Sequence, residues 1–244
     1  MQQPPYLKKG DSVTIISTAR KISKEEIQPA VDMLSNWGLK VRLGKHLFSS
    51  HHQFAGNSEQ RAEDFQRALE DDSKAILCAR GGYGSVQLLD KIDFSPFLAN
   101  PKWLIGYSDV TVFHNHINEN FGIETIHGTM PINFPKEETE ATSSLKNALF
   151  GHSLSHDFVL EEGSAVLDKS IEGPIVGGNL SVIYSLTGTA SQINCEGKIL
   201  FIEDSDEYLY HIDRMMMNLK RAGIFKGAKA ILVGGMSDMN DNQI

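Results

Sequence analysis

Short apolar segments alternate with segments of helical spacing in the first half of this 244-residue chain. Residues 75–79 and 103–105 contain no polar side chain. Between such segments apolar residues recur three or four positions apart, as in Ile27, Ala30 and Leu34, which is the spacing of one helix face. A strand that is apolar along its whole length is usually covered on both faces, as in a parallel sheet. The alternation therefore predicts an α/β fold with a parallel sheet, and ligands at the carboxyl ends of its strands.

The apolar segment 103–105 ends at Gly106, and helical spacing resumes with Val110, Phe113 and Ile117. Ser108 is therefore expected on a tight turn between a strand and a helix. This is the geometry of a nucleophile elbow, which exposes a serine hydroxyl beside the first amides of a helix. The G-x-S-x-G pattern is only half met, because position 110 is valine. The alternative is that Ser108 simply caps the helix.

A second turn, Arg80-Gly81-Gly82-Tyr83-Gly84, directly follows the apolar segment 75–79. Its glycines allow close approach of a ligand and leave amides free to donate. The loop could hold a phosphate, could form an oxyanion hole, or could be a tight turn without a ligand. Neither G-x-G-x-x-G nor a following Gly-Lys-Ser/Thr is present, so a nucleotide site has little support. An oxyanion hole is favoured because this loop and Ser108 both follow strands of one expected sheet.

The composition of the chain changes after about residue 135. A polar, acidic segment begins after Pro135, and it predicts a linker at about 135–165 between domains at 1–150 and 165–244. Beyond it, the apolar segment 198–202 is expected to be a strand. It ends at Glu203 and Asp204, a carboxylate pair at a strand terminus. Helical spacing at 209–219 and a last apolar segment at 230–233 complete a second, smaller α/β unit.

Composition excludes several classes of function. The net charge of −8 argues against a nucleic-acid or anionic-membrane surface. No apolar stretch approaches the roughly 20 residues of a membrane span, and the first residues lack the features of a signal peptide. The two cysteines, Cys78 and Cys195, do not form a disulfide framework. We therefore expect a cytoplasmic protein.

Together these motifs resemble the LD-carboxypeptidase family of serine peptidases over nearly the whole chain. The similarity rests on five segments that occur in the family's order and approximate spacing. They are Arg80-Gly-Gly-Tyr-Gly84, Gly106-Tyr-Ser-Asp-Val-Thr111, His127-Gly-Thr-Met130, Gly177-Gly-Asn-Leu180 and Phe201-Ile-Glu-Asp204, the last followed by Tyr208 and Asp213-Arg214.

The resemblance implies a fold, a site and a substrate. The fold is a Rossmann-like N-terminal domain and a smaller α/β C-terminal domain, with the site between them. A Ser-Glu-His triad would use Ser108 and Glu203, and the oxyanion donors would be the backbone amides of Gly82 and Asp109. The substrate would be a murein tetrapeptide, cut before its terminal D-alanine by a homodimer that uses no metal or other cofactor. By its position alone, Arg80 is a candidate partner for the terminal carboxylate, and the alternative is that it is a structural ion-pair residue.

The sequence departs from the family pattern at the histidine. That residue lies in a Gly-His motif beyond the strand ending at Val233, and none of the nine histidines here has this context. We therefore expect the triad histidine beyond Ile244, and residues 1–244 alone to be almost inactive, with His127 as the alternative base. From the local pattern alone, a Rossmann-like binder of a nucleotide or sugar phosphate also stays open. Within the resemblance, two other functions stay open. One is a microcin-immunity peptidase, although its glycine loop typically carries Asn where this chain has Gly84, and the other is a non-catalytic binder of cell-wall peptides.

Overall fold

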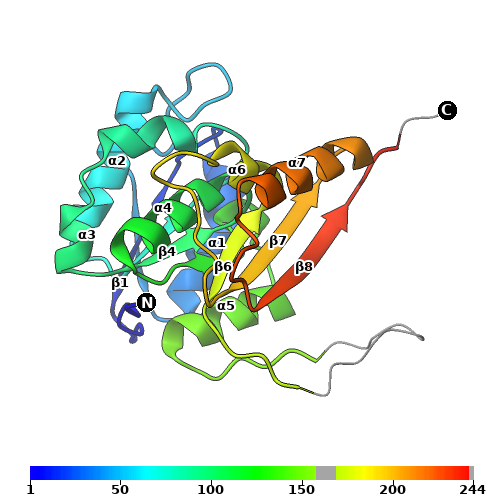
Figure 1. Ribbon diagram of the computed structural model, residues 1–244. Coiled ribbons are helices and arrows are strands. Elements are labelled where there is room, and N and C mark those ends of the chain that lie inside the picture. The colour runs from blue at the N-terminus through cyan, green and yellow to red at the C-terminus, as the bar shows by residue number, and fades with distance from the viewer. Residues whose placement is uncertain (158–168, 242–244) are drawn as a thin grey trace.

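The computed structural model describes residues 1–157 and 169–241, which form two parallel β-sheets with helices packed against them (Figure 1). The first sheet has the strand order β2-β1-β3-β4-β5, and every neighbouring pair is parallel. Its strands are β1 (Ser12–Ile16), β2 (Lys40–Leu43), β3 (Ala75–Cys78), β4 (Trp103–Gly106) and β5 (Ile126–His127). The predicted α/β class and parallel sheet are confirmed.

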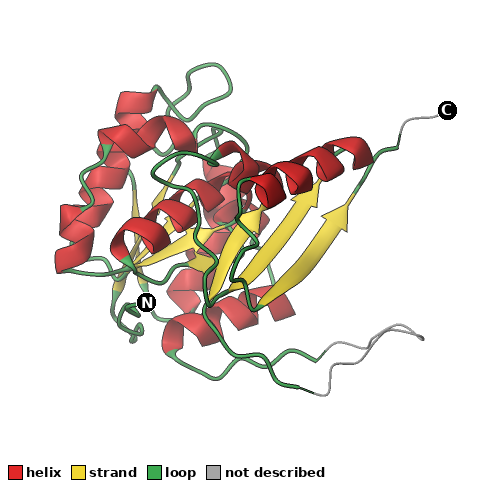
Figure 2. Cartoon of the chain, viewed as in Figure 1, coloured by secondary structure: helices red, strands yellow, loops and turns green. Residues whose placement is uncertain are grey.

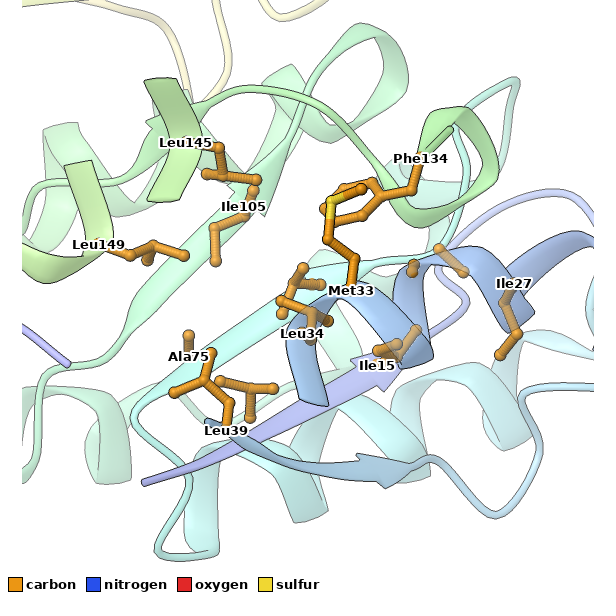
Figure 3. Packing of buried hydrophobic residues seen from close by; sticks show 14 of the residues in the cluster. Ile15, Ile27, Met33, Leu34, Leu39, Ala75, Ile105, Phe134, Leu145 and Leu149 are labelled. Atoms are coloured by element: carbon orange, nitrogen blue, oxygen red, sulfur yellow. The ribbon is translucent and has the colours of Figure 1, made fainter. Parts of the chain in front are cut away.

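Helices cover both faces of this sheet. One face packs against α1 (Lys24–Asn36) and α5 (Glu140–Phe150), and part of this core is drawn in Figure 3. The other face packs against α2 (Ser58–Glu70), α3 (Ser95–Ala99) and α4 (Thr111–Phe121). Successive strand residues point to opposite faces, so Leu104 and Ile105 enter different cores and both are fully buried. This explains why the central strands are apolar throughout.

Local sequence signals fix several boundaries. Ser23 and Asn57 each form a capping box with the residue three positions later, and so begin α1 and α2. Gly122 ends α4 in the left-handed conformation, with φ of 63°. Short 3₁₀ helices at Ser85–Lys91, Ser108–Val110 and Pro131–Asn133 follow the ends of strands. Because β1, β3 and β4 are parallel neighbours, the loops that follow them lie at one end of the sheet.

The second sheet has the order β6-β7-β8 and is also parallel (Figure 2). Its elements are β6 (Ile175–Asn179), α6 (Leu180–Ser185), β7 (Ile199–Ser205), α7 (Leu209–Arg221) and β8 (Ala230–Ser237). A separate core beneath α6 and α7 contains Leu180, Leu200, Met215 and Leu219. Strand β8 forms one edge of this sheet, where Leu232 and Val233 are about half exposed.

The region expected to be a linker contains a helix. Helix α5 lies within 135–165, because Thr139 caps it and Leu145 and Leu149 bury one face in the first core. The end of the expected linker and the expected domain start at 165 fall within 158–168, outside the described residues. Cys78 and Cys195 are buried free thiols, as predicted. Within the described residues, every helix is too short or too polar to cross a membrane.

Candidate active site

Ser108 occupies a strained turn between β4 and α4. Its φ of 60° lies in the left-handed region, which non-glycine residues rarely adopt. Gly106 makes the turn possible, because a Cβ there would lie 2.7 Å from a methyl carbon of Val110. The serine side chain forms no capping hydrogen bond for the following helices, so the alternative reading as an N-cap is not supported. The strand-turn-helix predicted from the sequence is present, with a half-buried hydroxyl at its tip.

The glycine loop after β3 lies directly against this serine. A Cβ on Gly81 would be 3.2 Å from both the Cβ and the Oγ atoms of Ser108, so a larger residue there would have to displace the serine side chain. The next residue, Gly82, has φ of 119°. No described turn or loop hydrogen bond uses the backbone amide of Gly82 or of Asp109. The structure thus brings together the three positions expected to form the nucleophile and the oxyanion hole.

The Asp109 carboxylate fastens the serine turn to the glycine loop. It is buried, and its Oδ2 atom accepts a hydrogen bond of 2.9 Å from the backbone N–H of Ser85. Desolvation raises the pKa of Asp109, and the loop amides and Arg61 oppose that rise. Sequence reasoning assigned a role only to the Asp109 amide. The side chain sets the spacing of the two loops, which determines where their amides point.

Arg61 forms hydrogen bonds to the same loop. It is 1% exposed, although it carries a charge. Its guanidinium donates to the carbonyls of Thr18 and Gly84 at 2.6 and 3.0 Å, and to the side chain of Gln87 at 2.7 Å. These acceptors satisfy the two terminal nitrogens and so offset much of the cost of burying the charge, while Nε has no hydrogen-bond partner among the described residues. The three bonds fix the position of the loop relative to α2. Helical spacing in α2 gave no signal of this role.

Glu203 lies on β7, and its side chain is 19% exposed. Its Oε1 atom is buried without a hydrogen-bond partner among the described residues. Burial raises the pKa of Glu203, and the charge of neighbouring Asp204 raises it further. Asp204 is 4% exposed and accepts hydrogen bonds from Asn179, Ser181 and its neighbour Ser205, so it is a structural residue.

Strand β6 connects Glu203 to the serine turn, and sequence reasoning did not recognise it as a strand. The backbone N–H of Asn179, which is the register partner of Glu203, donates to the Thr111 hydroxyl at 3.0 Å. A Cβ on Gly178 would collide with the Thr111 side chain, and one on Gly177 would collide with the carbonyl of Phe201. Paired glycines in a strand signal such close approaches, and that signal could have identified this junction.

Among the described residues, the histidine beside Glu203 is His127. Its Nε2 atom is 3.9 Å from Glu203 Oε1, and its ring contacts those of Tyr107 and Phe201. Burial lowers the pKa of His127 to about 4. It is therefore neutral at pH 7 and a weak base. Among the described residues, no three histidine, cysteine, aspartate or glutamate side chains are grouped to hold a metal ion.

Glu203→Gln is expected to stabilise the fold at neutral pH. Folding raises the pKa of Glu203, because burial disfavours the ionised carboxylate. Its contribution to the free energy of unfolding is therefore fully present below the unfolded pKa of about 4.3 and is lost as the pH rises through the folded pKa. Glutamine stays neutral at all pH values. Thermal melts should therefore show a higher Tm for the variant at pH 7 and a gap that closes toward pH 4. A gap independent of pH, or one shared by the exposed Glu137→Gln control, would contradict this.

Comparison with known proteins identifies the family of this chain. Residues 13–128 match the LD-carboxypeptidase N-terminal domain, and residues 172–244 match the LD-carboxypeptidase C-terminal domain. The chain is 37% identical over 235 residues to a probable murein peptide carboxypeptidase of Bacillus subtilis, covering 95% of this chain and 74% of that protein. It is 30% identical to the murein tetrapeptide carboxypeptidase of Pseudomonas aeruginosa, covering 93% and 76%.

Solved structures show the same fold. A muramoyltetrapeptide carboxypeptidase from Oxalobacter formigenes superposes with a TM-score of 0.84 at 27% identity, over 94% of this chain and 78% of that one. An MccF-like protein from Bacillus anthracis gives 0.82 at 28% identity, over 97% and 81%. Both domain models and both sequence relatives identify the same family. The chain belongs to the LD-carboxypeptidase family.

Proposed function

We propose that this protein is a serine carboxypeptidase that hydrolyses the L,D-peptide bond before the terminal D-alanine of murein tetrapeptides. The observation that carries the proposal is the contact of Ser108, at φ of 60°, with the glycine loop. Relatives named as murein peptide carboxypeptidases supply the substrate class. A cytoplasmic homodimer without a cofactor is part of the proposal and rests on the family resemblance.

In this mechanism the Ser108 Oγ attacks the carbonyl carbon and a base accepts its proton. A serine hydroxyl is a poor nucleophile at neutral pH and needs such a base within hydrogen-bond reach. The amides of Gly82 and Asp109 donate to the oxygen that gains negative charge. Collapse of the intermediate breaks the C–N bond, and the base returns the proton to the leaving D-alanine. Water then hydrolyses the acyl-enzyme by the same steps.

Glu203 is proposed to orient the histidine base and to stabilise its protonated form. Its partly buried carboxylate suits this role, because Oε1 has no hydrogen-bond partner among the described residues. His127 is close enough to interact with Glu203, but a pKa of about 4 makes it a weak proton acceptor at pH 7. The base is therefore proposed to be the family's Gly-His histidine rather than His127.

The microcin-immunity function is the second candidate, because solved neighbours include immunity proteins of that type. The loop geometry favours the murein function. Gly84 has φ of 133°, and a Cβ there would lie 2.6 Å from the Arg61 guanidinium. Asparagine, typical of the immunity type at this position, would be strained and would disturb the loop.

The proposal predicts release of D-alanine from a murein tetrapeptide by the full-length protein. A pentapeptide ending in D-alanyl-D-alanine should remain intact, since its terminal bond joins two D-residues. Mass spectrometry of both peptides after incubation measures the outcome. Equal cleavage of the two peptides would contradict the L,D assignment. Binding of the tetrapeptide without any cleavage would favour the non-catalytic binder.

A further inference from the structure

A carboxypeptidase must recognise the terminal carboxylate of its substrate. A carboxylate taken from water needs a cationic partner, and arginine binds one with two parallel hydrogen bonds. Three arginines lie around the glycine loop, namely Arg20, Arg61 and Arg80. Their existing contacts distinguish them. Recognition of the leaving amino acid by one of them rests on the proposed function.

Two of these arginines already have partners. Arg61 is buried, and its two terminal nitrogens donate to Thr18, Gly84 and Gln87. Arg80 was the candidate from the sequence. Its Nη1 atom donates to the carbonyl of Lys21 at 3.2 Å and lies 3.8 Å from a carboxylate oxygen of Glu26. These contacts tie Arg80 to the start of α1.

Arg20 has no such partner. It is exposed and follows the carboxyl end of β1, the strand beside β3 in the sheet. Within the described residues its guanidinium forms no ion pair or hydrogen bond. Its backbone is fixed on both sides, since Ala55 N–H donates to the Ala19 carbonyl and Lys21 N–H to the Gln53 carbonyl. A free cation is thus held on an anchored stretch of chain.

The Arg20 side chain runs across the oxyanion loop. A Cβ on Gly82 would lie 2.7 Å from Arg20 Cδ and 2.8 Å from its Nε. A Cβ on the preceding Gly81 would lie 3.2 Å from the Ser108 Oγ atom. Along the loop, the Arg20 side chain therefore lies against Gly82, and Ser108 lies against the adjacent Gly81. Glycine at position 82 leaves the space that the arginine stem occupies.

We propose that Arg20 binds the terminal carboxylate of the amino acid that is released. One residue spans at most about 3.6 Å, so this carboxylate must lie close to the carbonyl under attack and to its oxyanion donors. Among the described residues, the Arg20 guanidinium lies against Gly82, whose amide is a proposed oxyanion donor, and it has no ion-pair or hydrogen-bond partner. It therefore determines that the enzyme removes a terminal residue and does not cut within a chain.

The test uses two forms of one tetrapeptide. The first has a free terminal carboxylate, and the second carries a carboxamide in its place. Binding is measured by calorimetry in the Ser108→Ala background, so that neither peptide is consumed. Arg20→Ala should weaken binding of the free acid by about 10- to 100-fold, the usual value of a charge-assisted hydrogen bond, and leave the carboxamide almost unchanged. Arg20→Lys should restore part of the preference. In proteins that retain Ser108, kcat/KM should follow the same pattern.

Two further variants control the experiment. Arg221→Ala removes an exposed charge from the last turn of α7 and should preserve the preference for the free acid. Arg80→Ala tests the rival residue. Loss of the preference in Arg80→Ala but not in Arg20→Ala would overturn the proposal while the peptidase function stands. Equal loss of both peptides in Arg20→Ala would show only a structural role and would also overturn it. Failure of the unmodified protein to release D-alanine would instead refute the proposed function.

Discussion

Ser108→Ala is expected to lower kcat for D-alanine release by at least about 1000-fold, because loss of a triad member removes covalent catalysis and leaves only binding and the oxyanion hole. KM should change little, since the serine acts on the substrate carbonyl in the transition state rather than in ground-state binding. Steady-state kinetics with the tetrapeptide measure both constants. Circular dichroism should show an unchanged fold. Turnover near that of the unmodified protein would remove Ser108 from the mechanism.

Ser108→Gly provides a matched control. At φ of 60° glycine avoids the steric cost that serine bears, and a strained residue costs on the order of 1–3 kcal/mol. This variant should therefore be as inactive as Ser108→Ala and yet melt at a higher temperature than the unmodified protein. A lower Tm would mean that the turn is held by the serine side chain rather than strained by it.

The second large effect concerns the general base. A polypeptide that ends at Ile244 is expected to release D-alanine no faster than its own Ser108→Ala variant. Within residues 1–244, His127 is the histidine placed beside Glu203, and its pKa of about 4 leaves it a poor base at pH 7. Without a base the Ser108 hydroxyl keeps its proton, and the rate falls by several orders of magnitude.

The control is His127→Ala in the same polypeptide. Clear turnover by residues 1–244 that is abolished by His127→Ala would identify His127 as the base and would contradict the triad proposed here. Turnover unaffected by His127→Ala would exclude both assignments. The assay should compare samples at equal folded concentration, because Leu232 and Val233 at the edge of β8 are half exposed and such edges promote aggregation.

Much of the fold could be predicted because its signals are local. The all-apolar strands, the capping box at Ser23 and the left-handed glycine at 122 each depend on a few adjacent residues. The same holds for the turn at Ser108, whose strand and helix are both evident from apolar spacing. The prediction that this turn meets the glycine loop followed from topology, since the carboxyl ends of parallel strands share one edge.

The rest depended on contacts between distant segments. Strand β6 has glycines that local propensity disfavours in strands, and it exists because Gly177 and Gly178 pack tightly against β7 and Thr111. The linker region contains α5 because Leu145 and Leu149 find a place in the first core. Arg20 has no motif around it. Its position beside Gly82 emerges only when β1 and β3 are seen as neighbours.

Reaction with a fluorophosphonate probe tests the central claim most directly. Such a probe forms a covalent bond with an activated serine hydroxyl. We predict one adduct on the full-length protein, located on Ser108 by mass spectrometry of its peptides and absent from Ser108→Ala. Prior addition of the murein tetrapeptide should slow the labelling. An adduct on another residue, or D-alanine release from the tetrapeptide by Ser108→Ala at the rate of the unmodified protein, would contradict the account.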